Sequence, residues 1–272
     1  MAMPEKAISG ETEEKPIIVD CKDAVCMITL NRPAKLNSFN EDMHVALRSA
    51  LDVAANDRAV RALIFTGAGR GFSAGQDLSD RTGAPGSVDL QTTLERLYNP
   101  LVLKLRSMPF PVIAAVNGVA AGAGANIAFA CDIVVAAKSA KFIQSFSKIG
   151  LIPDSGGTWS LPRLVGRGKA FAIAALSETV DAEEAESLGL IWKVVDDEEL
   201  LPTCNTLAGK LAALPTKGLV KLRQLFDAAE KNDLAAQLEL ERKAQGELGA
   251  SADYAEGVRA FFEKRPPKYS PR

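Results

Sequence analysis

Histidine is almost absent from this chain, because His44 is the single histidine among its 272 residues. A metal site built from several histidines is therefore excluded, and a mechanism that needs a histidine has to use this one. The surrounding segment, NEDMHVALRSALDVA, has apolar residues at helical spacing, so we expect His44 to lie on the surface of a helix. Acid–base chemistry would then depend on carboxylates, a tyrosine or the backbone.

The chain also lacks an excess of charge of either sign. Its 32 Lys and Arg residues nearly balance 34 Asp and Glu residues, which leaves a formal net charge of −2. Such a balance supplies no field that would attract nucleic acid or an anionic membrane surface. Residues 110–131 carry no charge and approach the length of a membrane span. Pro111, glycines and asparagines interrupt them, however, so we predict a buried strand, turn and helix, with neither nucleic acid nor membrane as a partner.

Cysteine is scarce and shows no pattern typical of a disulfide-rich or metal-binding protein. The four cysteines, Cys21, Cys26, Cys131 and Cys204, form neither a C-x-x-C pair nor a regular framework. The first fifteen residues are polar and charged, which does not resemble a secretory signal. We therefore expect a protein of the reducing cytoplasm with a flexible tail over residues 1–15.

The first half of the chain alternates between strand-like and helical patterns. Strands are predicted over 16–20, 24–30, 60–66 and 111–116, helices over 40–56 and 89–107, and a loop over 82–87. Pro100 is expected to break or kink the second helix, because proline has no N–H to donate. This alternation predicts right-handed crossovers and a mostly parallel sheet, which is an α/β fold.

From about residue 155 the pattern becomes helical almost throughout. The exception is a predicted strand over 191–195 (IWKVV). With 47% hydrophobic residues the chain can fill a substantial core. We therefore divide it into the tail, a core over 16–198 and a helical region over 199–272.

Two glycine-rich segments follow predicted strands, at 67–78 (GAGRGFSAGQDL) and 117–126 (NGVAAGAGAN). Neither has the spacing of a dinucleotide-binding or P-loop motif. Small residues at a turn let the backbone approach a ligand, and a helix beginning near Ala123 would leave its first N–H groups unpaired. Two such turns could form an oxyanion hole for an enolate. The alternative is that both are only tight turns with close helix–sheet packing.

Four segments, 31–40, 67–78, 111–137 and 146–166, together resemble the enoyl-CoA hydratase/isomerase (crotonase) superfamily. The resemblance extends from about residue 16 to the C-terminus, and the chain is similar to a subgroup of isomerases acting on ring epoxides of aromatic acyl-CoA thioesters. It implies an α/β fold with a crotonase-like ββα spiral core and a C-terminal helical trimerisation region. It also implies an acyl-CoA thioester substrate, no metal or other cofactor because CoA arrives with the substrate, and a homotrimer or homohexamer.

The resemblance also implies roles for particular residues. The backbone N–H groups of Gln76 and Ala123 would bind the thioester oxygen. The residues implied to contact the substrate and its CoA are Ser73, Ala74, Gly75, Gln76, Asp77, Leu78, Ala123, Gly124 and Phe146. Hydratases of the family have glutamates at the positions of Asn126 and Phe146. Neither residue present here can transfer a proton, so hydration is disfavoured.

Asp154 is the acid that remains at a position where isomerases of the family have a catalytic carboxylate. The resemblance implies that it moves a proton on the thioester and so transposes a C=C bond, with its pKa raised by a pocket that includes Phe146 and Trp159. The alternative for Asp154 is an ordinary helix N-cap. Asp77 is expected to organise its turn or cap a helix, and Asp132 is expected to be structural.

The predicted function is thus an acyl-CoA isomerase that works through a thioester enolate. One alternative is a Δ3,Δ2-enoyl-CoA isomerase, or a generic enoyl-CoA hydratase/isomerase, acting on aliphatic thioesters. Another is a dehalogenase or thioester hydrolase with Asp154 as nucleophile. Family dehalogenases pair that aspartate with a histidine beyond the first glycine segment, and no histidine follows His44. A non-catalytic binding protein is a further alternative, which the presence of Asp154 disfavours.

Overall fold

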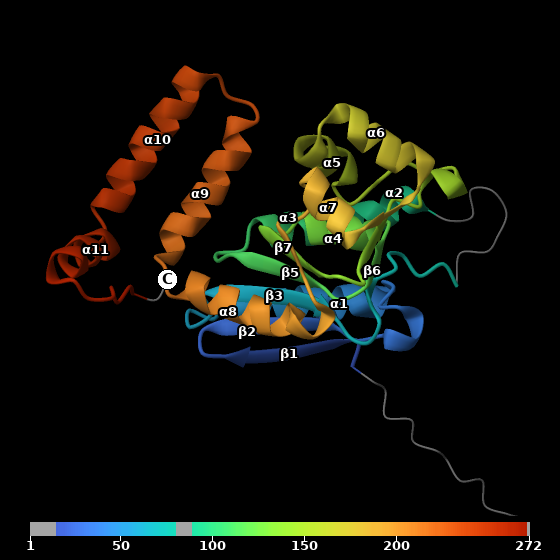
Figure 1. The fold of residues 1–272 in the computed structure, drawn as a ribbon, viewed down its shortest axis with the longest axis horizontal. Helices are drawn as coiled ribbons and strands as arrows, with labels where there is room; N and C mark the ends of the chain where they lie inside the picture. Colours follow the sequence, from blue (N-terminus) through green and yellow to red (C-terminus); the bar gives the residue numbers. More distant parts are fainter. Residues whose placement is uncertain (1–14, 80–88, 271–272) are drawn as a thin grey trace, which may run out of the picture.

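A computed structural model describes residues 15–79 and 89–270. Two β-sheets and the helices around them form the body of the molecule, and the last helices extend away from it (Figure 1). In the described residues the larger sheet has the strand order β1-β2-β3-β5-β7-β10, and the smaller has the order β4-β6-β8-β9. The predicted tail over 1–15, apart from Lys15, and the predicted loop over 82–87 lie outside the described residues.

The larger sheet is mostly parallel, as predicted. Its strands are β1 (Ile17–Lys22), β2 (Val25–Leu30), β3 (Ala62–Gly67), β5 (Val112–Val116), β7 (Ile133–Ala137) and β10 (Lys193–Val195). The strands of the smaller sheet are β4 (Gly71–Ser73), β6 (Val119–Ala121), β8 (Lys141–Ile143) and β9 (Thr179–Asp181). Only the pairs β1–β2 and β8–β9 among these described strands are antiparallel.

Helices connect the strands and fill the second half of the chain, in agreement with the prediction. They are α1 (Glu41–Asn56), α2 (Leu90–Thr93), α3 (Asn99–Arg106), α4 (Ala123–Phe129), α5 (Gly157–Val165), α6 (Arg167–Leu176), α7 (Ala182–Leu188), α8 (Leu200–Ala212), α9 (Thr216–Ala229), α10 (Leu234–Gly249) and α11 (Ala252–Glu263). Short helical turns are η1 (Pro33–Lys35), η2 (Leu94–Tyr98), η3 (Ser147–Ile149) and η4 (Asp197–Glu199).

The chain passes repeatedly from the larger sheet straight into the smaller one. β3 leads to β4, β5 leads to β6 and β7 leads to β8 through connections of two or three residues. A methyl group added at Gly118 would lie 2.2 Å from the carbonyl oxygen of Arg70, so successive connections stack without room for a side chain. This repetition is the predicted ββα spiral, and the α/β fold class with its C-terminal helical region is confirmed.

The smaller sheet was not predicted, and neither was β7. The strands of the smaller sheet have three residues each, which is too short for an alternating hydrophobic pattern to emerge. Their pairing depends on contacts between distant turns of the spiral, such as Val119 of β6 opposite Lys141 of β8. A local pattern carries no information about such contacts.

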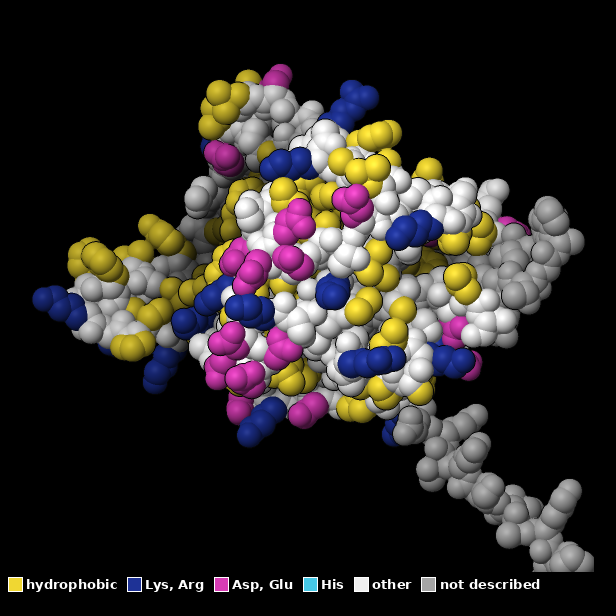
Figure 2. Space-filling view, turned by 45° about the vertical axis from the view of Figure 1, so that its right-hand side comes forward, with side chains coloured by type: hydrophobic (Ala, Val, Ile, Leu, Met, Phe, Trp, Pro, Cys, Tyr) yellow, Lys and Arg dark blue, Asp and Glu magenta, His cyan; other side chains and the backbone are white. Residues whose placement is uncertain are grey.

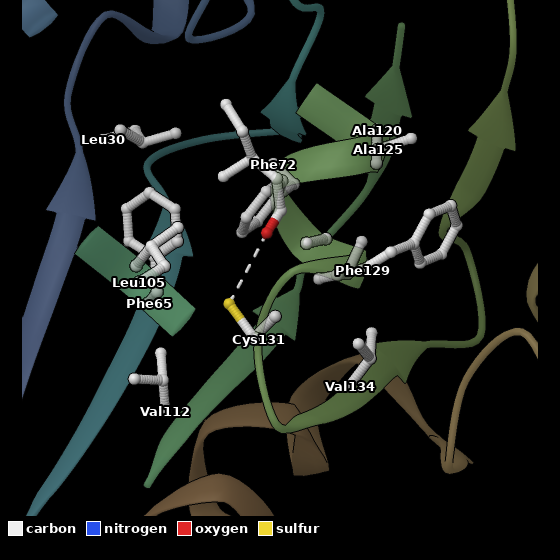
Figure 3. Packing of buried hydrophobic residues seen from close by; sticks show 14 of the residues in the cluster. Leu30, Phe65, Phe72, Leu105, Val112, Ala120, Ala125, Phe129, Cys131 and Val134 are labelled. Carbon is white, nitrogen blue, oxygen red and sulfur yellow. Dashed lines mark hydrogen bonds between the residues drawn. The ribbon is translucent and has the colours of Figure 1, made fainter. Parts of the chain in front are cut away.

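The core lies on both faces of the larger sheet because successive residues of its strands point to opposite sides. Leu63 and Phe65 belong to the cluster between the sheets, whereas Ile64 belongs to a second cluster that α8 covers with Leu200 and Cys204. Figure 3 shows the first cluster, in which the Cys131 thiol donates to a backbone oxygen of α4, that of Ile127, at 3.6 Å. α8 belongs to the predicted helical region 199–272, yet it packs on the larger sheet of the core. The division of the chain into a core and a helical region therefore stays a proposal.

The predicted break at Pro100 is confirmed, and it takes the form of a π-helical turn. The N–H of Asn99 donates to the carbonyl of Leu94, five residues earlier, in the segment η2 that joins α2 to α3. Pro100 then lies in the first turn of α3, where a missing N–H costs little. Such turns occur frequently at functional sites. This one ends at Tyr98.

His44 is buried, so the expectation that it lies on the surface is wrong. Its side chain is 2% exposed and packs against the rings of Phe39 and Tyr98, with centroid distances of 4.9 and 4.4 Å. Burial, with the charge of Arg48 as a smaller cause, lowers its pKa to about 4, so the imidazole is neutral at pH 7. His44 lies on the same buried face of α1 as Leu47. A hydrophobicity pattern does not show this, because it counts histidine as a polar residue.

A disulfide joins Cys21 to Cys26, which the sequence pattern did not indicate. The two residues lie directly opposite each other in the antiparallel pair β1–β2. Cys131 and Cys204 are free and buried. The strand register, and not the spacing in sequence, is what brings the first pair together.

The helices α9, α10 and α11 form an arm that projects from the body of the molecule (Figure 1). Hydrophobic side chains gather on this arm in the space-filling view (Figure 2), and Phe226 and Phe261 are 66% and 79% exposed. Arg223 of α9 fastens the arm to the sheet. Its guanidinium donates to the Asp132 carboxylate at 2.8 Å and to the carbonyl of Met108. Asp132 is therefore structural, as expected. Within the described residues no helix combines the length and the hydropathy that a membrane crossing requires.

Replacing Arg223 by Met should destabilise the protein. Arg223 is 8% exposed, and its loss leaves the Asp132 carboxylate without this cation and the Met108 carbonyl without this donor. We expect the free energy of unfolding, measured by urea denaturation, to fall by about 3 kcal/mol. The control Lys243→Met removes an exposed ion pair with Glu239 and should change it by no more than about 0.5 kcal/mol. Equal stability of both variants would contradict the anchoring role of Arg223.

Candidate active site

A cavity of about 440 Å³ opens where the two glycine-rich turns meet. The helical segment 90–99 and the loop before α5 complete its wall. The residues that line it are Ala74, Gly75, Gln76, Leu78, Leu90, Thr93, Leu94, Tyr98, Asn99, Gly122, Ala123, Ser145, Phe146, Ile149, Leu151, Ile152, Pro153, Asp154, Ser155, Gly156 and Thr158. Among these described residues Asp154 is the only one with a carboxylate. The wall is otherwise mostly apolar.

The first turn presents the N–H of Gln76 away from its neighbouring strand segment. Phe39 donates its N–H to the carbonyl of Gly75 at 2.7 Å, and its carbonyl accepts the N–H of Asp77 at 2.9 Å. This is a parallel bridge, in which Phe39 bonds to the residues on either side of Gln76. The peptide groups of Gln76 itself must therefore point the other way. The cavity lies on that side.

The second turn presents the N–H of Ala123 beside the first. Ala123 is the first residue of α4, so its N–H has no partner inside the helix. A methyl group added at Gly75 would lie 3.3 Å from the Ala123 nitrogen, and one added at Gly124 would lie 2.3 Å from the Ser73 oxygen. Only glycine permits this approach of the two turns. Within residues 15–79 and 89–270, neither Gln76 N–H nor Ala123 N–H donates to another protein group.

Asp154 lies across the cavity on the loop that precedes α5. Its carboxylate accepts a hydrogen bond from the Ser155 hydroxyl at 2.9 Å. Burial raises the pKa of Asp154, although the bond from Ser155 opposes that shift. The N-cap of α5 is Gly156, and no side chain caps this helix. The alternative that Asp154 is a helix cap is therefore wrong.

Asn126 holds the backbone of this loop in place. It is fully buried in α4, and its amide donates to the backbone carbonyl of Asp154 at 2.9 Å. Gln144 donates in turn to the amide oxygen of Asn126 at 2.9 Å. Gly157 packs on the same side chain, because a methyl group there would lie 2.4 Å from its amide nitrogen. Asn126 does not line the cavity, but it determines where Asp154 lies.

The structure brings most of the predicted site residues together. The predicted residues that line the cavity are Ala74, Gly75, Gln76, Leu78, Ala123, Phe146 and Asp154. Ser73, Asp77 and Gly124 are not among the described residues that line it. The Ser73 hydroxyl is buried and donates to the carbonyl of Asn37 at 2.8 Å. Their predicted contact with substrate stays a prediction.

Asp77 organises the first turn and caps none of the described helices, so the expectation of a helix cap is wrong for the part of the chain that the structure describes. Its carboxylate accepts from the N–H and the hydroxyl of Ser79 and pairs with Arg32 at 3.0 Å. The bonds from Ser79, assisted by Arg32, lower the pKa of Asp77 to about 2. This aspartate is therefore ionised and already engaged, which makes it a poor base.

Trp159 does not contribute to the pocket, so that expectation is wrong. It is 39% exposed, and its ring lies under the guanidinium groups of Arg163 and Arg106 at 4.4 and 5.4 Å. The left-handed backbone at Ser155 and Gly156 turns the chain between Asp154 and α5. Trp159 consequently faces outward although it lies only five residues further along.

The segment 90–99 contributes to the cavity wall, which was not predicted from the sequence. Leu90, Leu94 and Tyr98 follow one another at intervals of four residues, which places them on one helical face. That spacing was a usable signal for a buried face. It did not indicate that the face lines a cavity.

The model of the family described as enoyl-CoA hydratase/isomerase matches residues 20–272 of this chain. The chain belongs to the enoyl-CoA hydratase/isomerase family. This membership confirms the predicted resemblance and the crotonase fold, and it makes the chain an acyl-CoA isomerase or hydratase. Enzymes of the family generally need no cofactor. In the part of the chain that the structure describes, no group of three or more His, Cys, Asp or Glu side chains could hold a metal ion.

Members of this family cover almost the whole chain. The 1,2-epoxyphenylacetyl-CoA isomerase of Escherichia coli K12 is 52% identical over 93% of this chain and 98% of that protein. The 2,3-dehydroadipyl-CoA hydratase of the same organism is 34% identical over 94% and 99%. The crystal structure of an enoyl-CoA hydratase from Bacillus anthracis has a TM-score of 0.87 at 30% identity and covers 94% of this chain and 100% of its own. The expectation of an enzyme, an isomerase of this family, is confirmed.

Replacing Asp154 by Asn should stabilise the folded protein at neutral pH. Because burial raises the pKa of Asp154, the folded state binds the proton more tightly than the unfolded state. Stability from this group is therefore present at low pH and is lost as the pH rises through the folded pKa. The neutral amide avoids that loss. Thermal unfolding should show a melting temperature a few degrees above wild type at pH 7, with the difference shrinking toward pH 4; a lower value at pH 7 would contradict the burial argument.

Proposed function

We propose that this enzyme isomerises ring-1,2-epoxyphenylacetyl-CoA to the corresponding seven-membered oxepin-CoA, a step of phenylacetate catabolism. The observation that carries the proposal is the joint placement of one carboxylate, Asp154, and two free backbone donors, Gln76 and Ala123, around an apolar cavity. The rings of Tyr98 and Phe146 in its wall suit an aromatic acyl group. The 52% identical relative with this activity supports the choice of substrate.

The two backbone donors act on the thioester. Its carbonyl oxygen accepts hydrogen bonds from the N–H groups of Gln76 and Ala123, and these bonds strengthen as the oxygen gains negative charge. The CH₂ group between the ring and the thioester thereby becomes acidic enough to lose a proton. Backbone donors need no protonation change of their own, so they are ready at any pH.

Asp154 moves the proton. Its carboxylate takes a proton from this CH₂ group, which leaves an enolate held by the two N–H groups. The epoxide carbon–carbon bond opens as the ring expands, and Asp154 returns the proton to a ring carbon. The product is an isomer of the substrate, so no further reactant is consumed. The raised pKa of Asp154 suits a group that both accepts and returns a proton.

Hydration of an enoyl-CoA fits this site less well. It requires a base and an acid that hold a water molecule between them. Phe146 offers no polar atom, and the amide of Asn126 is engaged with the Asp154 carbonyl and Gln144. Proton relocation by one carboxylate is therefore the chemistry that these residues support.

We propose in addition that the enzyme works in the cytoplasm as a homotrimer or homohexamer, without a metal or cofactor of its own. The projecting arm supports assembly. A hollow of about 820 Å³ on the arm is lined by Phe261 and Phe262 together with polar residues such as Lys217 and Asp253. Large exposed apolar surfaces mark interaction sites. The described site needs only the substrate, which brings its own CoA.

The substrate can be identified with a panel of thioesters. We expect purified enzyme to convert ring-1,2-epoxyphenylacetyl-CoA to an isomer of unchanged mass with a new ultraviolet absorption, and at least about 10²-fold faster than it shifts the double bond of a 3-enoyl-CoA. Crotonyl-CoA should gain no water. Asp154→Asn should lose at least about 10²-fold in turnover while still binding phenylacetyl-CoA. Rapid formation of a 3-hydroxyacyl-CoA would show that the enzyme is a hydratase instead.

The pH dependence of kcat/KM tests the role of Asp154 as a base. Activity requires the carboxylate form, so it should fall as the pH drops through a pKa above the ordinary value of 3.8. The Ser155 hydroxyl donates to this carboxylate and so lowers its pKa. Ser155→Ala should therefore move the acid limb to higher pH while leaving activity at pH 8 nearly unchanged. An acid limb that does not move would assign the titration to another group.

A further inference from the structure

The side chain of Gln76 is fastened at both ends of its amide. Its Nε2 donates to the carbonyl of Phe39 at 3.1 Å and to the carbonyl of Asp77 at 3.0 Å. Its Oε1 accepts the Tyr98 hydroxyl at 2.8 Å. The amide thus connects three segments of the chain: the end of the segment before α1, its own turn, and the π-helical turn η2. A residue whose backbone alone mattered would not need such bonds.

We propose that Tyr98, acting through the Gln76 side chain, is a positioning residue that aims the Gln76 N–H at the thioester oxygen. The inference rests on the proposed function, because it takes that N–H to be an oxyanion donor. It gives the Gln76 side chain a role besides that of the backbone N–H. Tyr98 and Gln76 would work as one clamp, defined as the Tyr98 hydroxyl and the Gln76 amide.

The clamp adds to a restraint that the local backbone already provides. Gly75 precedes the donor peptide with φ at +85°, in a region that glycine enters freely. Glycine gives the turn its close approach to Ala123, and the peptide between Gly75 and Gln76 is held at its carbonyl, which accepts the Phe39 N–H at 2.7 Å. A donor must be aimed before the charge develops if it is to stabilise the transition state. The three hydrogen bonds of the Gln76 amide restrain the same residue through its side chain as well.

Tyr98 is itself held firmly. Its side chain is 2% exposed, and its ring makes edge contacts with His44 at 4.4 Å and Phe39 at 6.0 Å between centroids. The π-helical turn ends at Tyr98, which lies in the cavity wall. Its ring therefore borders the space for the acyl group while its hydroxyl holds the donor residue. The buried His44 acts as packing behind this ring.

The test uses three variants of the whole enzyme and one control. Tyr98→Phe removes only the hydroxyl, Gln76→Met keeps the length of the side chain without its hydrogen bonds, and the double variant combines them. Tyr254→Phe is the matched control, because Tyr254 is 59% exposed on the arm. The probe is phenylacetyl-CoA with ¹³C at the thioester carbonyl, whose infrared stretching frequency reports how strongly the bound oxygen is polarised.

We expect Tyr98→Phe to reduce the red shift of the bound carbonyl and to lower kcat. Loss of a whole oxyanion donor lowers kcat by about 10²–10³-fold. Loss of the Tyr98 hydroxyl, which only positions such a donor, should lower kcat by less, about tenfold. Binding of phenylacetyl-CoA should change by less than about twofold, because the uncharged ground state uses the donor little. Tyr254→Phe should match wild type in all three measurements.

The comparison of the two single variants with the double variant decides whether Tyr98 acts through Gln76. If it does, Gln76→Met and the double variant should have the same kcat and the same carbonyl frequency. Additive losses, or a Tyr98→Phe enzyme with the full wild-type red shift, would overturn the clamp. A wild-type complex with no red shift at all would instead overturn the oxyanion hole itself, and with it the proposed function.

Discussion

The whole site depends on two turns of backbone that touch where no Cβ fits between them. Gly124 lies against the carbonyl of Ser73, and Gly75 lies against the first residues of α4. This contact exists because each turn of the spiral passes from the larger sheet into the smaller one over very few residues. Any side chain at these positions would separate the strands β4 and β6 and, with them, the N–H groups of Gln76 and Ala123.

Once the donors belong to the backbone, the side chains around the cavity decide what reaction follows. Asn126 illustrates this division. Its amide supports the loop of Asp154, at a position where the family resemblance implies a proton-transferring glutamate in hydratases. Asp154 remains as the single described carboxylate in the wall, and its burial raises its pKa. The same burial that costs folding stability at neutral pH makes the group a better base.

The sequence was most informative where a residue type has few structural uses. The glycine segments, the apolar strands and the break at Pro100 were recognised because glycine, alternation and proline constrain the backbone directly. The short strands of the smaller sheet, the burial of His44 and the outward orientation of Trp159 were not. Each of these features depends on contacts with a segment that is distant in the sequence. The burial of His44, for example, depends on its contact with Tyr98. A local pattern of hydrophobic and polar residues does not predict such contacts.

The amino-acid sequence by itself determined the chemical inventory of this protein: the carboxylate of Asp154, glycines at two turns, no glutamate at position 126 or 146, and no histidine beyond His44. The tertiary structure alone decided how that inventory is used. It bonded Ser73 to Asn37 and Asp77 to Arg32, opposed Cys21 to Cys26, and joined Tyr98 to the amide of Gln76. The physical reason is that hydrogen bonds and close packing act over a few ångströms, and only folding brings residues so far apart in sequence within that range.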